Sequence, residues 1–176
     1  MDSLKFLDMI SWAFYLGCNV FAVCLLWASK SRQPLARLIL FSLFLFAAGA
    51  NTYIALDAPW SYRDFADTAM PLYKQFIVGA FIPIITPMVL TIAICQLLIA
   101  VAMTATGQIF QAGCWAGIIF CIAIAPLGLY AAFPMPLLLA WAIFRLLRTD
   151  KDQTKDSNMQ RLNQITKKHH ARPIAN

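Results

Sequence analysis

The chain of 176 residues lacks several residue types that most catalytic sites need. It contains no glutamate, and its only histidines, His169 and His170, stand near the carboxyl end. A histidine-bound haem inside a helical bundle is therefore excluded, as are zinc sites of the HExxH type and Glu-x-x-His di-metal sites. The five cysteines include no C-x-x-C pair, which argues against a thiol–disulfide relay. We accordingly expect no cofactor and no bound metal, and the chain offers few residues for enzymatic chemistry.

Charged residues are also missing from one long stretch of the chain. Between Lys74 and Arg145 lie 70 residues without a single Asp, Glu, Lys, Arg or His. Over the whole chain 61% of the residues are hydrophobic and 12% are charged, which is well below the charged fraction of ordinary globular domains. A transmembrane helix needs about 20 apolar residues, so the stretch predicts two or three crossings of a bilayer. The sequence therefore indicates an all-α, polytopic transmembrane helix bundle over residues 1–148.

Polar residues and prolines divide the bundle into five predicted helices, which span residues 9–29, 38–57, 79–104, 112–127 and 133–148. The polar run at 104–108 ends the third helix. Pro126 and Pro134 separate the fourth helix from the fifth, because proline removes a backbone donor and disfavours helix in the residue before it. In the alternative with four crossings, the last two helices would be a hairpin that enters the bilayer only partly.

The charges between the helices favour five crossings over four. Segments 30–37 and 145–176 carry net charges of +3 and +5, whereas segments 1–8 and 57–74 carry −1 each. Five crossings place both positive segments on one side of the membrane and both negative segments on the other, as the positive-inside tendency asks. We therefore expect the amino terminus outside and the carboxyl terminus in the cytoplasm.

The tail, residues 149–176, is polar and basic. Its composition predicts a disordered cytoplasmic segment that anionic lipid attracts by charge. Because the basic residues cluster at segment ends and in this tail, the net charge of +6 is interpreted as a topology signal, and no nucleic-acid partner is expected.

An interfacial amphipathic segment is predicted between the second and third helices, over residues 60–76. Its apolar residues recur at helical spacing with charged residues between them. Besides the tail, it is the only sizeable element expected outside the membrane, so recognition of a ligand or partner is best sought there. The residues that could bind a ligand or partner are Asn51, Asp57, Trp60, Tyr62, Arg63, Asp64, Asp67 and Tyr73.

Five of these residues also have a structural interpretation. Trp60, Tyr62 and Tyr73 suit an aromatic belt at the headgroup level of the bilayer. Asp57 stands just before Pro59, where it would end the second helix at the water interface. Asn51, like Asn19 and Gln96, suits a hydrogen bond to a neighbouring helix.

Small residues recur every four positions along the fourth helix, at Gly113, Gly117, Cys121 and Ala125. Such a ridge allows two helix backbones to approach closely where no hydrophobic effect drives them together. We expect the ridge to pack inside the bundle. Contact with a second copy of the chain or with a partner in a membrane complex is the alternative.

Several short strings between Phe46 and Leu147 resemble uncharacterised small membrane proteins of bacteria. They are Gly49-Ala50-Asn51-x-Tyr53, Phe65-Ala66-Asp67, Pro71-Leu72-Tyr73, and Ala123-Ile124-Ala125-Pro126-Leu127-Gly128 followed by Phe133-Pro134. Size and hydropathy are loosely similar to those of DoxX-like proteins. The resemblance implies a bacterial inner membrane and no particular activity.

Three functions remain open at this point. The favoured one is a non-enzymatic bundle that acts as an accessory subunit or binds an apolar small molecule or membrane lipid. The second is a small transporter or channel in which Asp57 and Asn51 line a path. The third is an enzyme at the outer interface that uses Asp57, Asp64 and Asp67 as acid, base or metal ligands.

A labelling experiment at Tyr130 tests the number of crossings. A single cysteine placed there, with the native cysteines removed, should react with a membrane-impermeant maleimide added to intact cells, because five crossings put this position outside. Reaction only after the cells are opened, or no reaction at all, would return the count to four.

Overall fold

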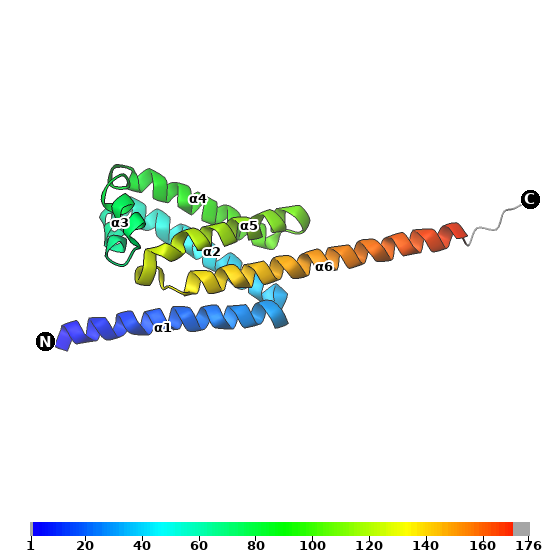
Figure 1. Ribbon diagram of the computed structural model, residues 1–176, viewed down its shortest axis with the longest axis horizontal. Coiled ribbons are helices and arrows are strands. Elements are labelled where there is room, and N and C mark those ends of the chain that lie inside the picture. The colour runs from blue at the N-terminus through cyan, green and yellow to red at the C-terminus, as the bar shows by residue number, and fades with distance from the viewer. Residues whose placement is uncertain (1, 171–176) are drawn as a thin grey trace, which may run out of the picture.

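The computed structural model describes residues 2–170, and the whole of this part is built from helices and short connections without a strand (Figure 1). The α-helices are α1 Asp2–Ser31, α2 Gln33–Asp57, α3 Pro71–Val78, α4 Ile85–Thr104, α5 Gly107–Ile124 and α6 Met135–His170. Three 3₁₀ helices connect them: η1 Pro59–Asp67, η2 Ile82–Ile84 and η3 Ala125–Ala131. The prediction of an all-α fold is confirmed.

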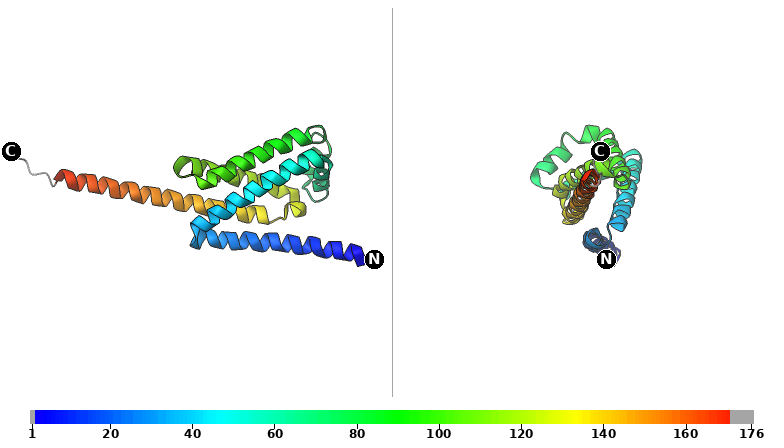
Figure 2. Two further views of the ribbon diagram at one scale, coloured as in Figure 1. Left: turned by 180° about the vertical axis from the view of Figure 1, so that it is seen from behind. Right: turned by 90° about the vertical axis from the view of Figure 1, so that its right-hand side faces the viewer.

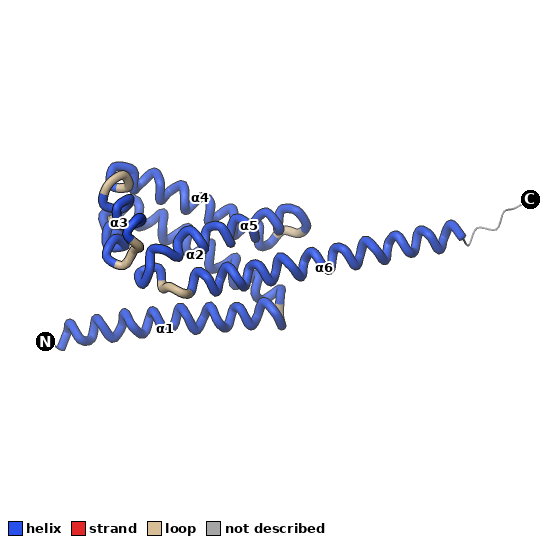
Figure 3. The backbone as a smooth tube through the Cα atoms, viewed as in Figure 1, coloured by secondary structure: helices blue, strands red, loops and turns tan. Residues whose placement is uncertain are grey.

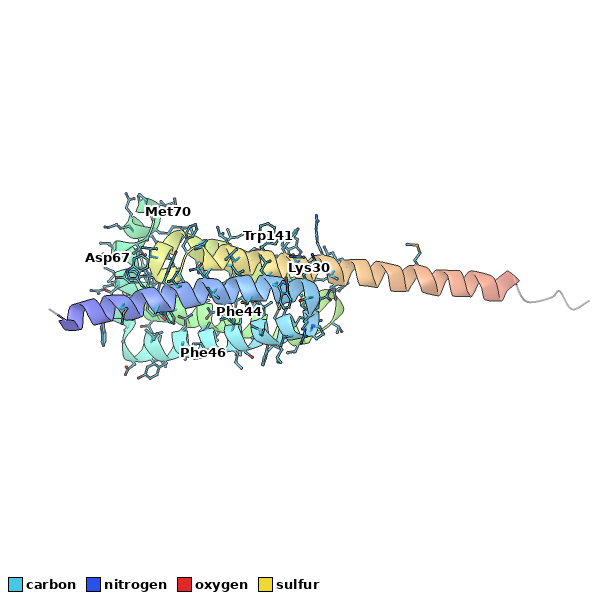
Figure 4. All side chains as sticks on the ribbon, turned by 90° about the horizontal axis from the view of Figure 1, so that it is seen from below. Lys30, Phe44, Phe46, Asp67, Met70 and Trp141 are labelled. Atoms are coloured by element: carbon cyan, nitrogen blue, oxygen red, sulfur yellow. The ribbon has the colours of Figure 1, made fainter. Side chains whose placement is uncertain are left out.

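The five long helices run alternately up and down (Figures 1 and 2). Helices α2, α4, α5 and α6 form the bundle, and α1 lies at its edge, against α6 and α2. Loops are confined to a few turns at the two ends (Figure 3). One end holds η1, α3 and η3, and the other holds the α1–α2 and α4–α5 turns. Lys30 and Asp67 lie toward these opposite ends, in line with the charge pattern of the sequence (Figure 4).

Among the described residues, four helical stretches are long and apolar enough to cross a membrane: Ser11–Ser31, Gln33–Asp57, Ile82–Thr104 and Gly107–Ala131. The fifth predicted helix, 133–148, corresponds to the first part of α6, whose apolar portion is shorter. This portion runs antiparallel to α5 and packs against it. The fifth crossing stays a prediction.

Large apolar side chains cover the outside of the bundle as well as its interior. On α2, Phe44 is 3% exposed while Phe46, two residues later, is 77% exposed and points away from the other helices (Figure 4). Trp141 on α6 is likewise 60% exposed. Such exposed aromatic and aliphatic surface would be costly in water and fits contact with lipid tails.

The observed ends of the middle helices differ from the predicted ones. The third predicted helix begins at Ile85 rather than at residue 79, because Pro83 lies in η2 and Pro87 lies in the first turn of α4, where the missing backbone donor is tolerated. The fourth begins at Gly107 rather than at 112. Only Ala105 and Thr106 form the break, since the glycine adopts a φ of +64° that allows the chain to reverse.

The tail differs most from its prediction. Residues 149–170 continue α6 as a single helix beyond the bundle instead of forming a disordered segment (Figure 1). No glycine or proline interrupts residues 137–172, so nothing in the local sequence ends the helix that the bundle starts. The final part of the predicted tail, 171–176, lies outside the described residues.

The end of the bundle near the α4–α5 turn is tightly packed. A Cβ atom on Gly113 would collide with Ala102 of α4, and one on Gly117 would lie 3.1 Å from Ile143 of α6. Cys121 and Ala125, the other members of the small-residue ridge, are 1% and 8% exposed. The ridge is therefore buried within the bundle, which accounts for it without a second copy of the chain.

Arg37 of α2 secures the same end. Its Nε donates to the carbonyl of Met103 at 2.9 Å, its Nη2 donates to the carbonyl of Ala105, and its guanidinium lies 4.0 Å above the ring of Phe110. The carbonyls at the end of a helix have no partner within the helix, so a cation placed there satisfies them and interacts favourably with the helix dipole. Arg37 thus fixes the turn between α4 and α5.

At the opposite end η1 and α3, residues 59–78, form a segment that we call the cap. It buries Ala66 and Ile77 against Ala55 of α2 and Val89 of α4 in a small second core. The hydroxyl of Thr68 donates to the carbonyl of Leu127 in η3 at 2.8 Å. Two further bonds join the cap to η3 and α5, from the Met70 amide to the Pro126 carbonyl and from the Tyr73 hydroxyl to the Ala123 carbonyl, each at 2.9 Å.

Gly128 should be essential to this attachment. It has φ +78° and ψ −139°, a conformation that side chains strongly disfavour, and a Cβ atom there would collide with the Thr68 carbonyl. We expect Gly128→Ala to lower the free energy of unfolding by about 2 kcal/mol or more, measured by thermal unfolding of the purified protein.

Gly49→Ala is the matched control. Gly49 lies within α2, and a Cβ atom added there would have no neighbouring atom within 4 Å, so the same change should leave stability unchanged or slightly higher. Equal effects of the two substitutions would contradict the role assigned to Gly128.

Candidate functional site: an apolar cavity beneath the cap

A cavity of about 830 Å³ lies between the helices on the cap side of the bundle. Its walls come from α2, α4, α5, η3 and the first turns of α6, and the cap contributes Phe65, Leu72 and Phe76. The volume falls within the range of small-molecule sites, and such sites are mostly apolar with a few placed polar groups. None of the described lining residues is charged. The arrangement therefore suits a neutral, apolar occupant.

Side chains at helical spacing build the walls. On α4 the cavity is lined by Val89, Ile92 and Gln96, which share one face of the helix because they are three and four residues apart, and by Met88 beside them. Toward the tightly packed end, the rings of Phe44 on α2 and Phe120 on α5 meet edge to face, 5.9 Å between centroids. Both rings also line the cavity and bound it on that side.

Three polar side chains form a hydrogen-bonded chain along the cavity. The hydroxyl of Tyr62 in the cap donates to Oδ1 of Asn51 on α2 at 2.8 Å. Nδ2 of Asn51 in turn donates to Oε1 of Gln96 on α4, also at 2.8 Å. The chain connects the cap to the two helices below it. A hydrogen bond of this kind between helices in a membrane contributes about 0.6–2 kcal/mol.

Gln96 ends this chain with unused donors. It is 3% exposed, it lines the cavity, and within residues 2–170 the structure pairs its Nε2 with no acceptor. Leaving such a donor unpaired in apolar surroundings costs about 1–3 kcal/mol. A bound molecule with an acceptor oxygen would remove that cost.

Tyr62 supplies the chain with a stable donor. Burial raises the pKa of its phenol above the ordinary value, since the anion would be desolvated. The hydroxyl therefore stays protonated throughout the neutral range and continues to donate to Asn51. Because neither Asn nor Gln titrates, the direction of the hydrogen-bonded chain does not depend on pH near neutrality.

The structure divides the candidate binding residues of the sequence into two groups. Asn51, Tyr62 and Tyr73 line the cavity. The others have exposed side chains and do not line it: Asp57, Trp60, Arg63, Asp64 and Asp67. Within the described part of the chain, no group of three His, Cys, Asp or Glu residues could hold a metal ion, so the three carboxylates do not converge.

Gln96 is the site residue that sequence reasoning assigned to packing alone. A polar residue in the middle of an apolar helix was expected to bond a neighbouring helix, and its Oε1 does so. Its spacing could have indicated a role in the cavity, because Gln96 lies on the same helix face as Met88 and Ile92. A polar group on the face that α4 turns inward needs partners from the protein, from water or from a ligand.

Comparison with protein-family models, with curated proteins and with solved structures gave no match. The class of this protein is accordingly defined by its own structure. Over residues 2–170 it is all-helical, and four helical stretches there are long and apolar enough to cross a membrane, which fits an integral membrane location. Beneath its cap lies an uncharged cavity large enough for a small molecule.

Proposed function

We propose that this protein is a non-enzymatic membrane protein that binds a neutral apolar small molecule or a lipid in the cavity beneath the cap. The observation that carries the proposal is the cavity itself: about 830 Å³ with apolar walls and no charged side chain among its described lining residues. A site built this way offers shape and apolar contact rather than acid–base or nucleophilic groups.

The proposal includes a location in a bacterial inner membrane with five crossings. The amino terminus and the cap lie outside and the carboxyl-terminal half of α6 lies in the cytoplasm. The alternating directions of α1, α2, α4, α5 and α6 support this arrangement, as does the positive charge near the α1–α2 turn and at the end of the apolar part of α6. A ligand would then reach the cavity from the outer half of the bilayer.

The other two functions receive less support from the geometry. A path lined by both Asp57 and Asn51 is not formed, because Asn51 faces the cavity while Asp57 is exposed at the end of α2. An uncharged cavity does not favour ion or proton coupling. The exposed positions of Asp64 and Asp67 likewise offer no enclosed site for acid–base chemistry. A role as accessory subunit remains compatible with ligand binding.

Native mass spectrometry of the purified full chain tests the proposal. We expect the wild type to retain an apolar small molecule or lipid. Ala47→Phe should lose it, since Ala47 lines the cavity on α2 and the added ring would occupy the space. Ala116→Phe is the matched control, because Ala116 is exposed on α5 outside the cavity, and it should retain the ligand.

Two results would count against the proposal. One is a wild-type protein without any retained molecule, which also fails to take up added lipid. The other is retention that is the same in Ala47→Phe and in the wild type, which would place the bound molecule on the outer surface of the helices.

A further inference from the structure

Among the buried amide groups that line the cavity, N–H donors are left without a partner, whereas each oxygen has one. The oxygens of Asn51 and Gln96 already accept hydrogen bonds, from Tyr62 and from Asn51 respectively, each at 2.8 Å. The hydroxyl of Tyr73 is committed as a donor to the Ala123 carbonyl at 2.9 Å. The donors left over are both N–H bonds of Nε2 of Gln96, which has no acceptor within the described residues, and the second N–H bond of Nδ2 of Asn51.

This donor lies deep in the bundle. Gln96 is 11 residues beyond the start of α4 at Ile85, which corresponds to about 16 Å along the helix axis. Gln96 as a whole is 3% exposed, and it lines the cavity rather than the outer surface of the bundle. A donor directed into a cavity with apolar walls is satisfied when the occupant brings an acceptor.

From these observations we infer that the ligand is a neutral apolar molecule with a carbonyl oxygen, of a ketone or an ester, that accepts a hydrogen bond from Nε2 of Gln96. The inference rests on the proposed binding function and adds the chemical class of the ligand. It also fixes the orientation, because the carbonyl lies at the depth of Gln96 while the apolar body fills the space toward the cap.

The charge and the hydrogen-bond pattern select this class over related ones. A carboxylate would enter without a counter-charge, since no described lining residue is basic. An alcohol or amine would bring a donor of its own, which would have to share an amide oxygen of Asn51 or Gln96 that already accepts one hydrogen bond. A hydrocarbon would leave the Gln96 donors unpaired. An acceptor that donates nothing matches what the cavity lacks.

Benzophenone and diphenylmethane form a matched pair of probes for this inference, because they differ in having a carbonyl or a methylene between the same two rings. We expect the full-length protein in lipid nanodiscs to bind benzophenone about tenfold more tightly, as one ordinary hydrogen bond implies. The carbonyl stretching band of bound benzophenone should shift to lower frequency. Methyl laurate against tridecane, compared in the same way, distinguishes an ester ligand from a ketone.

Gln96→Leu removes the donor while keeping an apolar side chain of similar size. With this variant the two probes of each pair should bind with about equal affinity, and the carbonyl band should return to its unshifted position. Gln108→Leu is the matched control, because Gln108 is exposed near the start of α5 and does not line the cavity. It should behave as the wild type does. Should Gln96→Leu fail to fold, the wild-type preference and the infrared shift decide by themselves.

The inference is overturned if the wild type shows no preference within either pair, if the carbonyl band does not shift, or if a folded Gln96→Leu keeps the preference. These outcomes are separable from failure of the proposed function. If both members of a pair bind the wild type equally and both are lost in Ala47→Phe, the cavity binds ligands and only the carbonyl assignment is wrong. If neither member binds and native mass spectrometry finds no retained molecule, the proposed function fails as well.

Discussion

The close approach of α4 and α5 at Gly113 and Ala102 is the contact on which the rest of the structure depends. No side chain larger than hydrogen fits at Gly113, and Arg37 holds the carbonyls of the adjoining turn. Two straight helices that touch at one end and cross at an angle must separate at the other. The cavity lies on the side where they separate, between Gln96 on α4 and Phe120 on α5.

In the described part of the chain, the end of the bundle at which α4 and α5 separate is not covered by another long helix. The cap covers it with two short helices whose polar side chains bond to η3 and α5 and whose apolar residues face the cavity. Gly128 allows the chain of η3 to meet the Thr68 carbonyl directly. The hydrogen bonds from Tyr62 through Asn51 to Gln96 then join the cap to the helix pair beneath it. A ligand bound in the cavity would contact all these parts at once.

The sequence predicted the all-helical fold class, because long apolar stretches carry direct physical meaning in a bilayer. It also proposed residues 60–76 as the place to seek recognition, and Tyr62 and Tyr73 of that segment line the cavity. It could not separate Tyr62 from Asp64, since both belong to the same short segment and only the path of η1 decides which of them turns inward. It also assigned Gln96 to packing alone, because the sequence does not show that α4 and α5 diverge. The extension of α6 was missed because the tail was judged by composition, whereas a helix once begun continues without a residue that ends it.

The most direct test of the binding cavity is an experimental structure of the full chain in lipid nanodiscs, prepared without removal of native lipid. We expect non-protein density beneath the cap, bounded by Phe44 and Phe120 and with an atom within hydrogen-bonding distance of Nε2 of Gln96. A cavity closed by repacked side chains such as Phe76, or one that a helix of a neighbouring subunit fills, would contradict the proposed site.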